Sequence, residues 1–132
     1  MNSRLLRWGL ALAVAGSSAL AAAQDFTFTI IHNNDIHSHV EPSKVRDVEL
    51  GGWGRLAGKM AQLKAKAVNP IILNAGDSFQ GTIFFNVYEG MAEAAFMNLA
   101  GYQAMTLGNH EFDKGPATLA KFLDQVTFPV LG

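Results

Sequence analysis

The sequence predicts an α/β protein whose strands form a parallel sheet. Short runs of β-branched and aliphatic residues alternate with longer helical segments, in the order β-α-β-α-β-α-β. The helical segments are long enough to serve as right-handed crossovers between parallel strands. With 132 residues, 49% of them hydrophobic and 16% charged, the chain has the length and composition of one ordinary domain.

Residues 1–23 are predicted to be a secretory signal peptide and not part of the fold. Arg4 and Arg7 are their only charged residues, and a short apolar run and small residues lead to Ala21–Ala23. The apolar run is shorter than the ~20 residues of a membrane span, although an uncleaved anchor is the alternative. Cleavage is expected before Gln24 or slightly earlier, which predicts export to the periplasm, the cell envelope or the extracellular space.

The first half of the mature chain predicts a strand, a loop, a helix and a second strand. Alternating aromatic and β-branched residues over 26–31 predict a strand covered on both faces. A polar loop follows, in which the charged stretch 44–49 is expected to be solvated. Apolar residues then recur at helical spacing and predict an amphipathic helix over 53–67. The Asn69-Pro70 pair ends this helix, and residues 71–73 form a short buried strand.

The second half predicts two further helices, each followed by a strand. Residues 89–100 are rich in Ala, Met and Glu, and the helix that they predict ends at Gly101. A third strand is expected over 104–107. A proline suited to the first helical position opens a helix over 116–126, and residues 127–131 begin a fourth strand.

Polar clusters follow each of the first three predicted strands. They run from Asn34 to His39, from Asn74 to Ser78 and from Gly108 to Asp113. Ligands bind outside the carboxyl ends of the strands in an open α/β sheet. Because parallel strands place these ends at one edge, we expect the three clusters to converge there.

The residue types in these clusters can bind metal ions through nitrogen and oxygen ligands, without a sulfur ligand. The chain has no cysteine, so the ligands must come from His, Asp, Glu or Asn. Asp35 and His37 are two residues apart at a strand end and point the same way. The Asp77 carboxylate can bridge two cations, and Asn109 offers a neutral carbonyl oxygen. This mixed set suits Mn, Fe, Zn or Co and predicts a two-metal centre for displacement at phosphorus.

The neighbouring polar residues are predicted to act on the substrate or to support the ligands. His110 and Asp113 are three residues apart, so the carboxylate can orient an imidazole that protonates a leaving oxygen or stabilises phosphoryl charge. Asn34 and His39 are candidates for supporting the metal ligands without binding the metal themselves, although Asn34 is equally suited to a turn. Glu111 is expected to cap or pair locally.

Three motifs resemble the metallophosphoesterase superfamily. They are D-x-H at 35–37, G-D-x-x-x-G at 76–81 and G-N-H-E-F-D at 108–113. The residues in these motifs are most similar to those of the bacterial periplasmic 5′-nucleotidases, which include UDP-sugar hydrolases and 2′,3′-cyclic-nucleotide phosphodiesterases. The resemblance covers essentially the whole mature chain, 24–132. It implies that these residues form the first half of a four-layer α/β/β/α sandwich.

The resemblance also implies two divalent metal ions and a role for each motif residue. Asp35 and His37 match ligands of one ion, Asp77 matches the bridging ligand, and Asn109 matches a ligand of the other ion. The residue matching His110 acts on the phosphate in the transition state, paired with the one matching Asp113, and Asn109 also lies at the substrate. The implied reaction is hydrolysis of a nucleotide or another small phosphoester by metal-activated water.

The family pattern continues beyond this sequence. It implies further histidines in later G-H and G-H-x-H motifs, whereas no histidine follows His110 here. We therefore expect the N-terminal part of a longer enzyme without its C-terminal substrate domain. Two alternatives are a catalytically incomplete metal- or phosphate-binding remnant and a related hydrolase of the thiosulfate-pathway type.

Charge and hydropathy limit the other partners that we expect. The formal net charge of −1 offers no electrostatic attraction to nucleic acid. No stable membrane span is expected after the signal peptide is cleaved.

Overall fold

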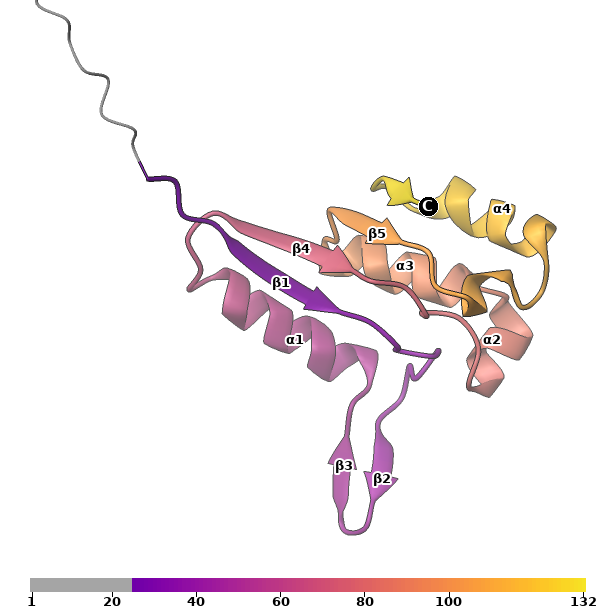
Figure 1. The fold of residues 1–132 in the computed structure, drawn as a ribbon. Coiled ribbons are helices and arrows are strands. Elements are labelled where there is room, and N and C mark those ends of the chain that lie inside the picture. The colour runs from indigo at the N-terminus through magenta and orange to yellow at the C-terminus, as the bar shows by residue number, and fades with distance from the viewer. Residues whose placement is uncertain (1–24) are drawn as a thin grey trace, which may run out of the picture.

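The computed structural model describes residues 25–132, so the predicted signal peptide lies outside the described residues (Figure 1). The predicted strands and helices occur in the predicted order, with a hairpin and two short helices added. In chain order the elements are β1 (Thr29–Asn33), β2 (Ser43–Val45), β3 (Val48–Leu50), α1 (Trp53–Lys64), β4 (Pro70–Asn74), α2 (Ile83–Tyr88), α3 (Met91–Ala100), β5 (Ala104–Thr106), the short 3₁₀ helix η1 (His110–Phe112), α4 (Pro116–Gln125) and β6 (Val130–Leu131).

The main sheet is parallel throughout, which confirms the predicted α/β class. Its strand order is β1-β4-β5-β6. Ile31 of β1 pairs with Ile72 of β4, and Met105 of β5 pairs with Val130 of β6. Each new strand is added on the same side of the previous one, so right-handed crossovers place the connecting helices on one face of the sheet.

The hydrophobic core lies between that face of the sheet and the helices. It takes side chains from every layer of the packing: Ile31, Ile72 and Met105 from the strands, Trp53 and Met60 from α1, Met97 from α3, and Phe122 from α4. On the opposite face, Ile30 is 51% exposed and Leu131 is 60% exposed. The expectation that the first strand is covered on both faces is therefore wrong for the described residues. A four-layer sandwich, as the resemblance implies, would add a layer on this open face.

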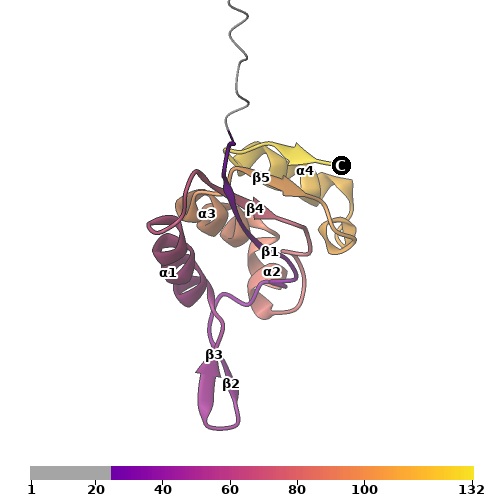
Figure 2. The same ribbon diagram turned by 60° about the vertical axis from the view of Figure 1, so that its left-hand side comes forward.

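A hairpin occupies part of the stretch that was predicted to be a loop. β2 and β3 pair antiparallel, with Lys44 opposite Glu49, and all their side chains are exposed. The charged stretch is solvated as expected, but it is a hairpin. Figures 1 and 2 both show it projecting away from the sheet. Short strands with no buried face leave no periodic pattern of apolar residues, so the sequence did not reveal them.

Helix α2 was also not predicted. It has only six residues, too few for an apolar period to repeat. The Thr82 hydroxyl caps its start by accepting a hydrogen bond from the Phe84 N–H at 3.3 Å. Glu89 and Gly90 both have positive φ, 49° and 91°, where α2 ends and α3 begins. The helix expected over 89–100 therefore starts only at Met91.

Two other elements have ends that differ from the predicted ones, and the start of β1 is set by strand pairing. β1 begins at Thr29, where pairing with Pro70 of β4 begins. Phe26 and Phe28 precede this pairing and are 76% and 55% exposed, so the predicted start at residue 26 is too early. Helix α1 ends at Lys64, three residues before the predicted end.

Among residues 25–132, no helix is long and apolar enough to cross a membrane.

Tyr102 lies buried beneath the carboxyl ends of β1 and β4. Its hydroxyl donates a hydrogen bond to Asn33 Oδ1 at 2.6 Å. Burial raises the pKa of Tyr102 to about 12, against the opposing effect of its hydrogen bonds. The pKa of a tyrosine in an unfolded chain is about 10. The stability that Tyr102 contributes is therefore complete below that pH and is lost as the pH rises toward its folded pKa.

We expect one of the two tyrosines to ionise near pH 12 in the folded protein. Alkaline titration followed by tyrosinate absorbance measures this transition. Tyr102→Phe should remove it, and Tyr88→Phe, at an exposed position, should leave it in place. If Tyr102→Phe instead removes a transition near the usual tyrosine pKa, the buried environment of Tyr102 is not as described.

Candidate metal centre

The loops that follow β1, β4 and β5 meet at one edge of the sheet. The N–H groups of Asp35 and His37 donate to the carbonyl oxygens of Gly76 and Asp77, each at 3.1 Å. The His110 N–H donates to Asp77 Oδ1 at 3.0 Å, which ties the third loop to the second. These contacts confirm that the three polar clusters converge.

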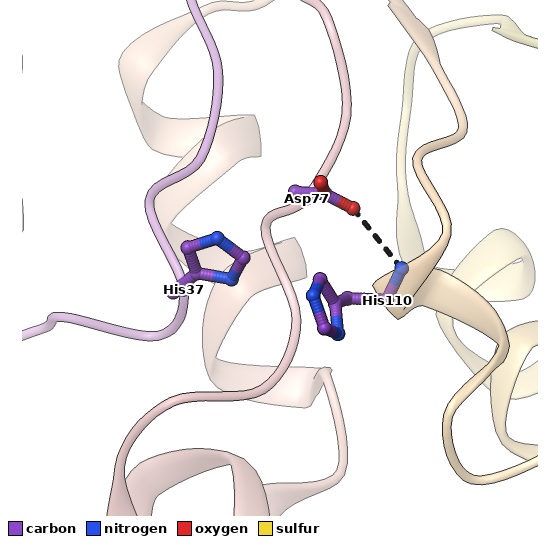
Figure 3. Close-up of side chains that lie close together, drawn as sticks. All are labelled: His37, Asp77 and His110. Atoms are coloured by element: carbon purple, nitrogen blue, oxygen red, sulfur yellow. Dashed lines mark hydrogen bonds between the residues drawn. The ribbon is translucent and has the colours of Figure 1, made fainter.

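His37, Asp77 and His110 form the centre of this edge. Each offers one ligand atom, and the three atoms lie within 4.8 Å of one another. Figure 3 shows the His37 and His110 rings next to each other, with the Asp77 carboxylate close to both. The ring centroids of His37 and His110 are 5.0 Å apart, with the rings nearly perpendicular at 82°. Side chains from three separate loops thus surround one small volume.

The hydrogen bond of His37 leaves one ring nitrogen free for a cation. His37 Nδ1 lies 3.1 Å from the Phe79 carbonyl oxygen, which can only accept, so we assign the proton to Nδ1. In the neutral ring, Nε2 then carries a lone pair, and it lies 3.4 Å from Asp35 Oδ1. These two lone pairs face each other favourably when a cation, either a metal ion or a proton on Nε2, lies between or beside them. The arrangement therefore fits a metal ion, and its N and O donors fit Mn, Fe, Zn or Co.

The backbone of these loops is held in unusual conformations. Asp35, His37, Ser38 and Asp77 all have φ between 47° and 55°, in the left-handed region that non-glycine residues seldom adopt. Such conformations persist only where the surroundings enforce them, and they gather at functional sites. Here the hydrogen bonds between the loops provide the enforcement, for example from Ser38 N–H to the Ser78 carbonyl at 2.9 Å.

His110 and Asp113 form the predicted pair. His110 Nδ1 lies 2.7 Å from Asp113 Oδ2, across the single turn of η1. This hydrogen bond is the main reason that the pKa of His110 is raised, and the charges of Asp113, Asp77 and Glu111 add to it. The raised pKa favours an imidazolium, which has a proton at Nε2 to donate.

The remaining predicted residues lie at the rim of this centre. Asn109 is exposed and directly precedes His110. Asn34 Nδ2 donates a hydrogen bond to Asp35 Oδ2, the carboxylate of a predicted ligand. His39 Nδ1 lies 3.0 Å from the Ile36 carbonyl oxygen, and His39 lines a hollow of about 370 Å³ together with Asn34 and Asp35. His39 is not part of the three-residue group.

Glu111 has a larger part in the site than the sequence indicated. Its side chain is fully buried and accepts hydrogen bonds from the backbone N–H groups of Asp77, Ser78, Phe79 and Gly108. The expected local capping accounts only for the Gly108 contact, three residues away. The only sequence signal is an acidic residue at a capping-box spacing, and this signal does not reveal the distant partners.

Comparisons with known proteins agree with this geometry. The 5′-nucleotidase of Rattus norvegicus is 44% identical over 117 residues, covering 83% of this chain and 20% of that protein. The NAD 5′-nucleotidase of Haemophilus influenzae is 40% identical over 111 residues, covering 78% and 18%. A crystal structure of a 5′-nucleotidase precursor from Thermus thermophilus superposes with a TM-score of 0.77 at 45% identity, covering 81% of this chain and 22% of that one.

The chain thus spans about a fifth of the length of these relatives. They favour a nucleotidase relationship over the remnant and the thiosulfate-pathway alternative. The sequence model of the calcineurin-like phosphoesterases matches residues 28–131, nearly all of the described structure. With the predicted motifs gathered at one sheet edge around His37, Asp77 and His110, this match shows that the chain belongs to the calcineurin-like phosphoesterase family of hydrolases.

Proposed function

We propose that this chain provides the metal centre and the phosphate-facing histidine of an exported 5′-nucleotidase. The observation that carries the proposal is the close approach of His37, Asp77 and His110, whose ligand atoms lie within 4.8 Å of one another. Relatives named 5′-nucleotidases support nucleotides as the substrate class. Export is supported by the signal-peptide pattern of residues 1–23 and by the description of the Thermus relative as a precursor.

The proposed ligands come from all three loops. Asp35 and His37 would hold one ion, Asp77 would bridge two ions, and Asn109 would hold the second. Divalent ions, when bound, neutralise phosphate charge and allow water to act as a nucleophile near neutral pH. The Phe79 carbonyl keeps the His37 ring turned so that Nε2 faces the site. A hydrogen bond that fixes the ring in this orientation lowers the ordering that metal binding requires.

His110 is proposed to act on the phosphate and the leaving group. Asp113 holds Nδ1, so Nε2 of the imidazolium remains free for a phosphoryl oxygen or the departing ester oxygen. In the reaction, water attacks phosphorus and the phosphorus–oxygen bond to the nucleoside breaks. The departing oxygen takes a proton from Nε2, which gives the nucleoside and inorganic phosphate. Asp113 stabilises the imidazolium before the transfer and keeps the ring in position after it.

Release of inorganic phosphate from AMP by the full chain, with added Mn²⁺, tests this proposal. We expect phosphate release that stops when a chelator removes the metal. His110→Ala should lower the rate by about 10²-fold or more, the usual effect of losing a positioned acid. His32→Ala is the matched control, because His32 is exposed on β1 and takes no part in the group. Equal rates in both variants, or a rate that is independent of Mn²⁺, would contradict the proposal.

A further inference from the structure

Glu111 is a buried charged group to which the proposed mechanism gives no task. Its Oε1 accepts hydrogen bonds from the N–H groups of Ser78 at 2.7 Å and Phe79 at 3.2 Å. Its Oε2 accepts from the N–H groups of Asp77 at 2.9 Å and Gly108 at 2.6 Å. Each oxygen therefore has two donors and no lone pair left to carry a proton, so the group is a carboxylate. Charge-assisted bonds of this kind are about twice as strong as neutral ones.

The loop 76–79 lies between Glu111 and the loop 35–38. The N–H groups of residues 77–79 point to the Glu111 carboxylate, and the carbonyl groups of residues 76–78 accept from N–H groups of the loop 35–38. The Phe79 peptide shows the connection best. Its N–H donates to Glu111, and its carbonyl oxygen lies 3.1 Å from His37 Nδ1. One carboxylate on the third loop thus holds the second loop against the first.

We propose that Glu111 is the positioning residue of the metal centre. It fixes Asp77 directly, through the backbone of that residue, and it fixes the His37 tautomer through Phe79. The inference rests on the proposed function for the identity of the ligands. Glu111 does not touch the substrate in this proposal, since its side chain is fully buried behind the loops.

Glu93 offers a matched control for removing a buried glutamate. It is also fully buried, but neither carboxyl oxygen has a hydrogen-bond partner within residues 25–132. Burial raises the pKa of Glu93, and the Ser38 hydroxyl, which lies beyond hydrogen-bond distance, opposes this rise only in part. A glutamine oxygen at position 93 offers this hydroxyl the same kind of acceptor. Glu93→Gln therefore removes no backbone hydrogen bond of the ligand loops. Glu111→Gln keeps one acceptor oxygen for two of the four N–H groups and turns an amide NH₂, which cannot accept, toward the other two.

The first measurement reads the His37 tautomer in the metal-free full chain. Nitrogen-15 NMR of the four imidazoles distinguishes a ring protonated at Nδ1 from one protonated at Nε2. We expect Nδ1–H at His37 in the wild type and in Glu93→Gln. In Glu111→Gln the Phe79 carbonyl loses its fixed place, and we expect His37 to lose the pure Nδ1–H form. A residue that contributes only to global stability would leave this signature unchanged in the folded variant.

The second measurement is the dissociation constant for Mn²⁺, obtained by calorimetric titration of the full chain. Loss of a group that orients metal ligands usually weakens metal binding about 10- to 100-fold. We expect a weakening of this size in Glu111→Gln and the wild-type constant in Glu93→Gln. An unchanged His37 tautomer together with an unchanged Mn²⁺ constant in Glu111→Gln would overturn the positioning role.

The two measurements separate this inference from the proposed function. If the wild type binds no Mn²⁺, the proposed metal centre fails, and the NMR result alone decides whether Glu111 positions His37. If Glu111→Gln does not fold, Glu111→Asp takes its place. Its carboxylate keeps the charge but is one methylene too short to reach all four N–H groups. The inference again requires loss of the pure Nδ1–H form of His37, and a wild-type spectrum would refute it.

Discussion

Asp77→Asn is expected to abolish Mn²⁺ binding and Mn²⁺-dependent phosphate release while the protein remains folded. The asparagine keeps the shape of the side chain and an Oδ1 that accepts the His110 N–H, a contact of 3.0 Å in the wild type. It loses the negative charge at the place where the ligand atoms of His37, Asp77 and His110 lie within 4.8 Å. Because Asp77 is the proposed bridge, its loss should exceed the about 10- to 100-fold effect of removing a supporting group.

Calorimetric titration with Mn²⁺ and a phosphate-release assay measure this result, and thermal unfolding confirms that the variant is folded. Asp47→Asn makes the same chemical change in the exposed β2–β3 turn and should behave like the wild type. Wild-type Mn²⁺ affinity in Asp77→Asn would show that the carboxylate is not a ligand, and the proposed centre would have to be abandoned.

Gly76→Ala is expected to destabilise the protein by about 2 kcal/mol or more, through strain and a clash of backbone atoms. Gly76 has φ of 93°, a conformation unfavourable for alanine. A Cβ atom there would lie 2.5 Å from Gly108 N and 2.8 Å from Gly108 Cα. Backbone atoms cannot rotate away as a side chain can, so the loops after β4 and β5 must move apart. The same movement would separate Asp77 from His110, and Mn²⁺ binding should weaken as well.

Urea unfolding of the two glycine variants provides the measurement and its control. Gly58→Ala lies in the middle of helix α1, where an added Cβ meets nothing within 4 Å. Alanine is favoured over glycine in a helix interior, so this variant should gain about 0.5–1 kcal/mol. A loss of less than about 1 kcal/mol in Gly76→Ala would be no more than the average for a point substitution. It would show that the loops after β4 and β5 adapt to the added atom.

The order of strands and helices was predictable because each main element carries its own pattern. The helix at Trp53 has its apolar residues at helical spacing, and Pro116 suits the first position of α4. The ends of these elements were less predictable. β1 starts where Pro70 begins to pair with Thr29, and the aromatic residues before it stay exposed. Pairing of this kind depends on a partner distant in the sequence, which no local pattern reports.

In the candidate site, too, some features could be predicted from the sequence and others could not. The grouping of His37, Asp77 and His110 followed from motifs at the carboxyl ends of neighbouring parallel strands. Which ring nitrogen of His37 is left free could not be predicted, because it depends on the carbonyl of Phe79, 42 residues away. The role of Glu111 was likewise hidden, since three of its four donors lie more than 30 residues earlier.

By itself, then, the sequence determined the α/β class, the order of the main elements and the residue types at the three strand ends. These features are local, because they depend on apolar periodicity, helix starts and stops, and polar residues next to strands. Only the tertiary structure decided the open sheet face, the β2–β3 hairpin and the arrangement of Glu111, Phe79 and His37. Hydrogen bonds between distant loops determine which way these groups point, and such bonds exist only once the sheet has brought the loops together.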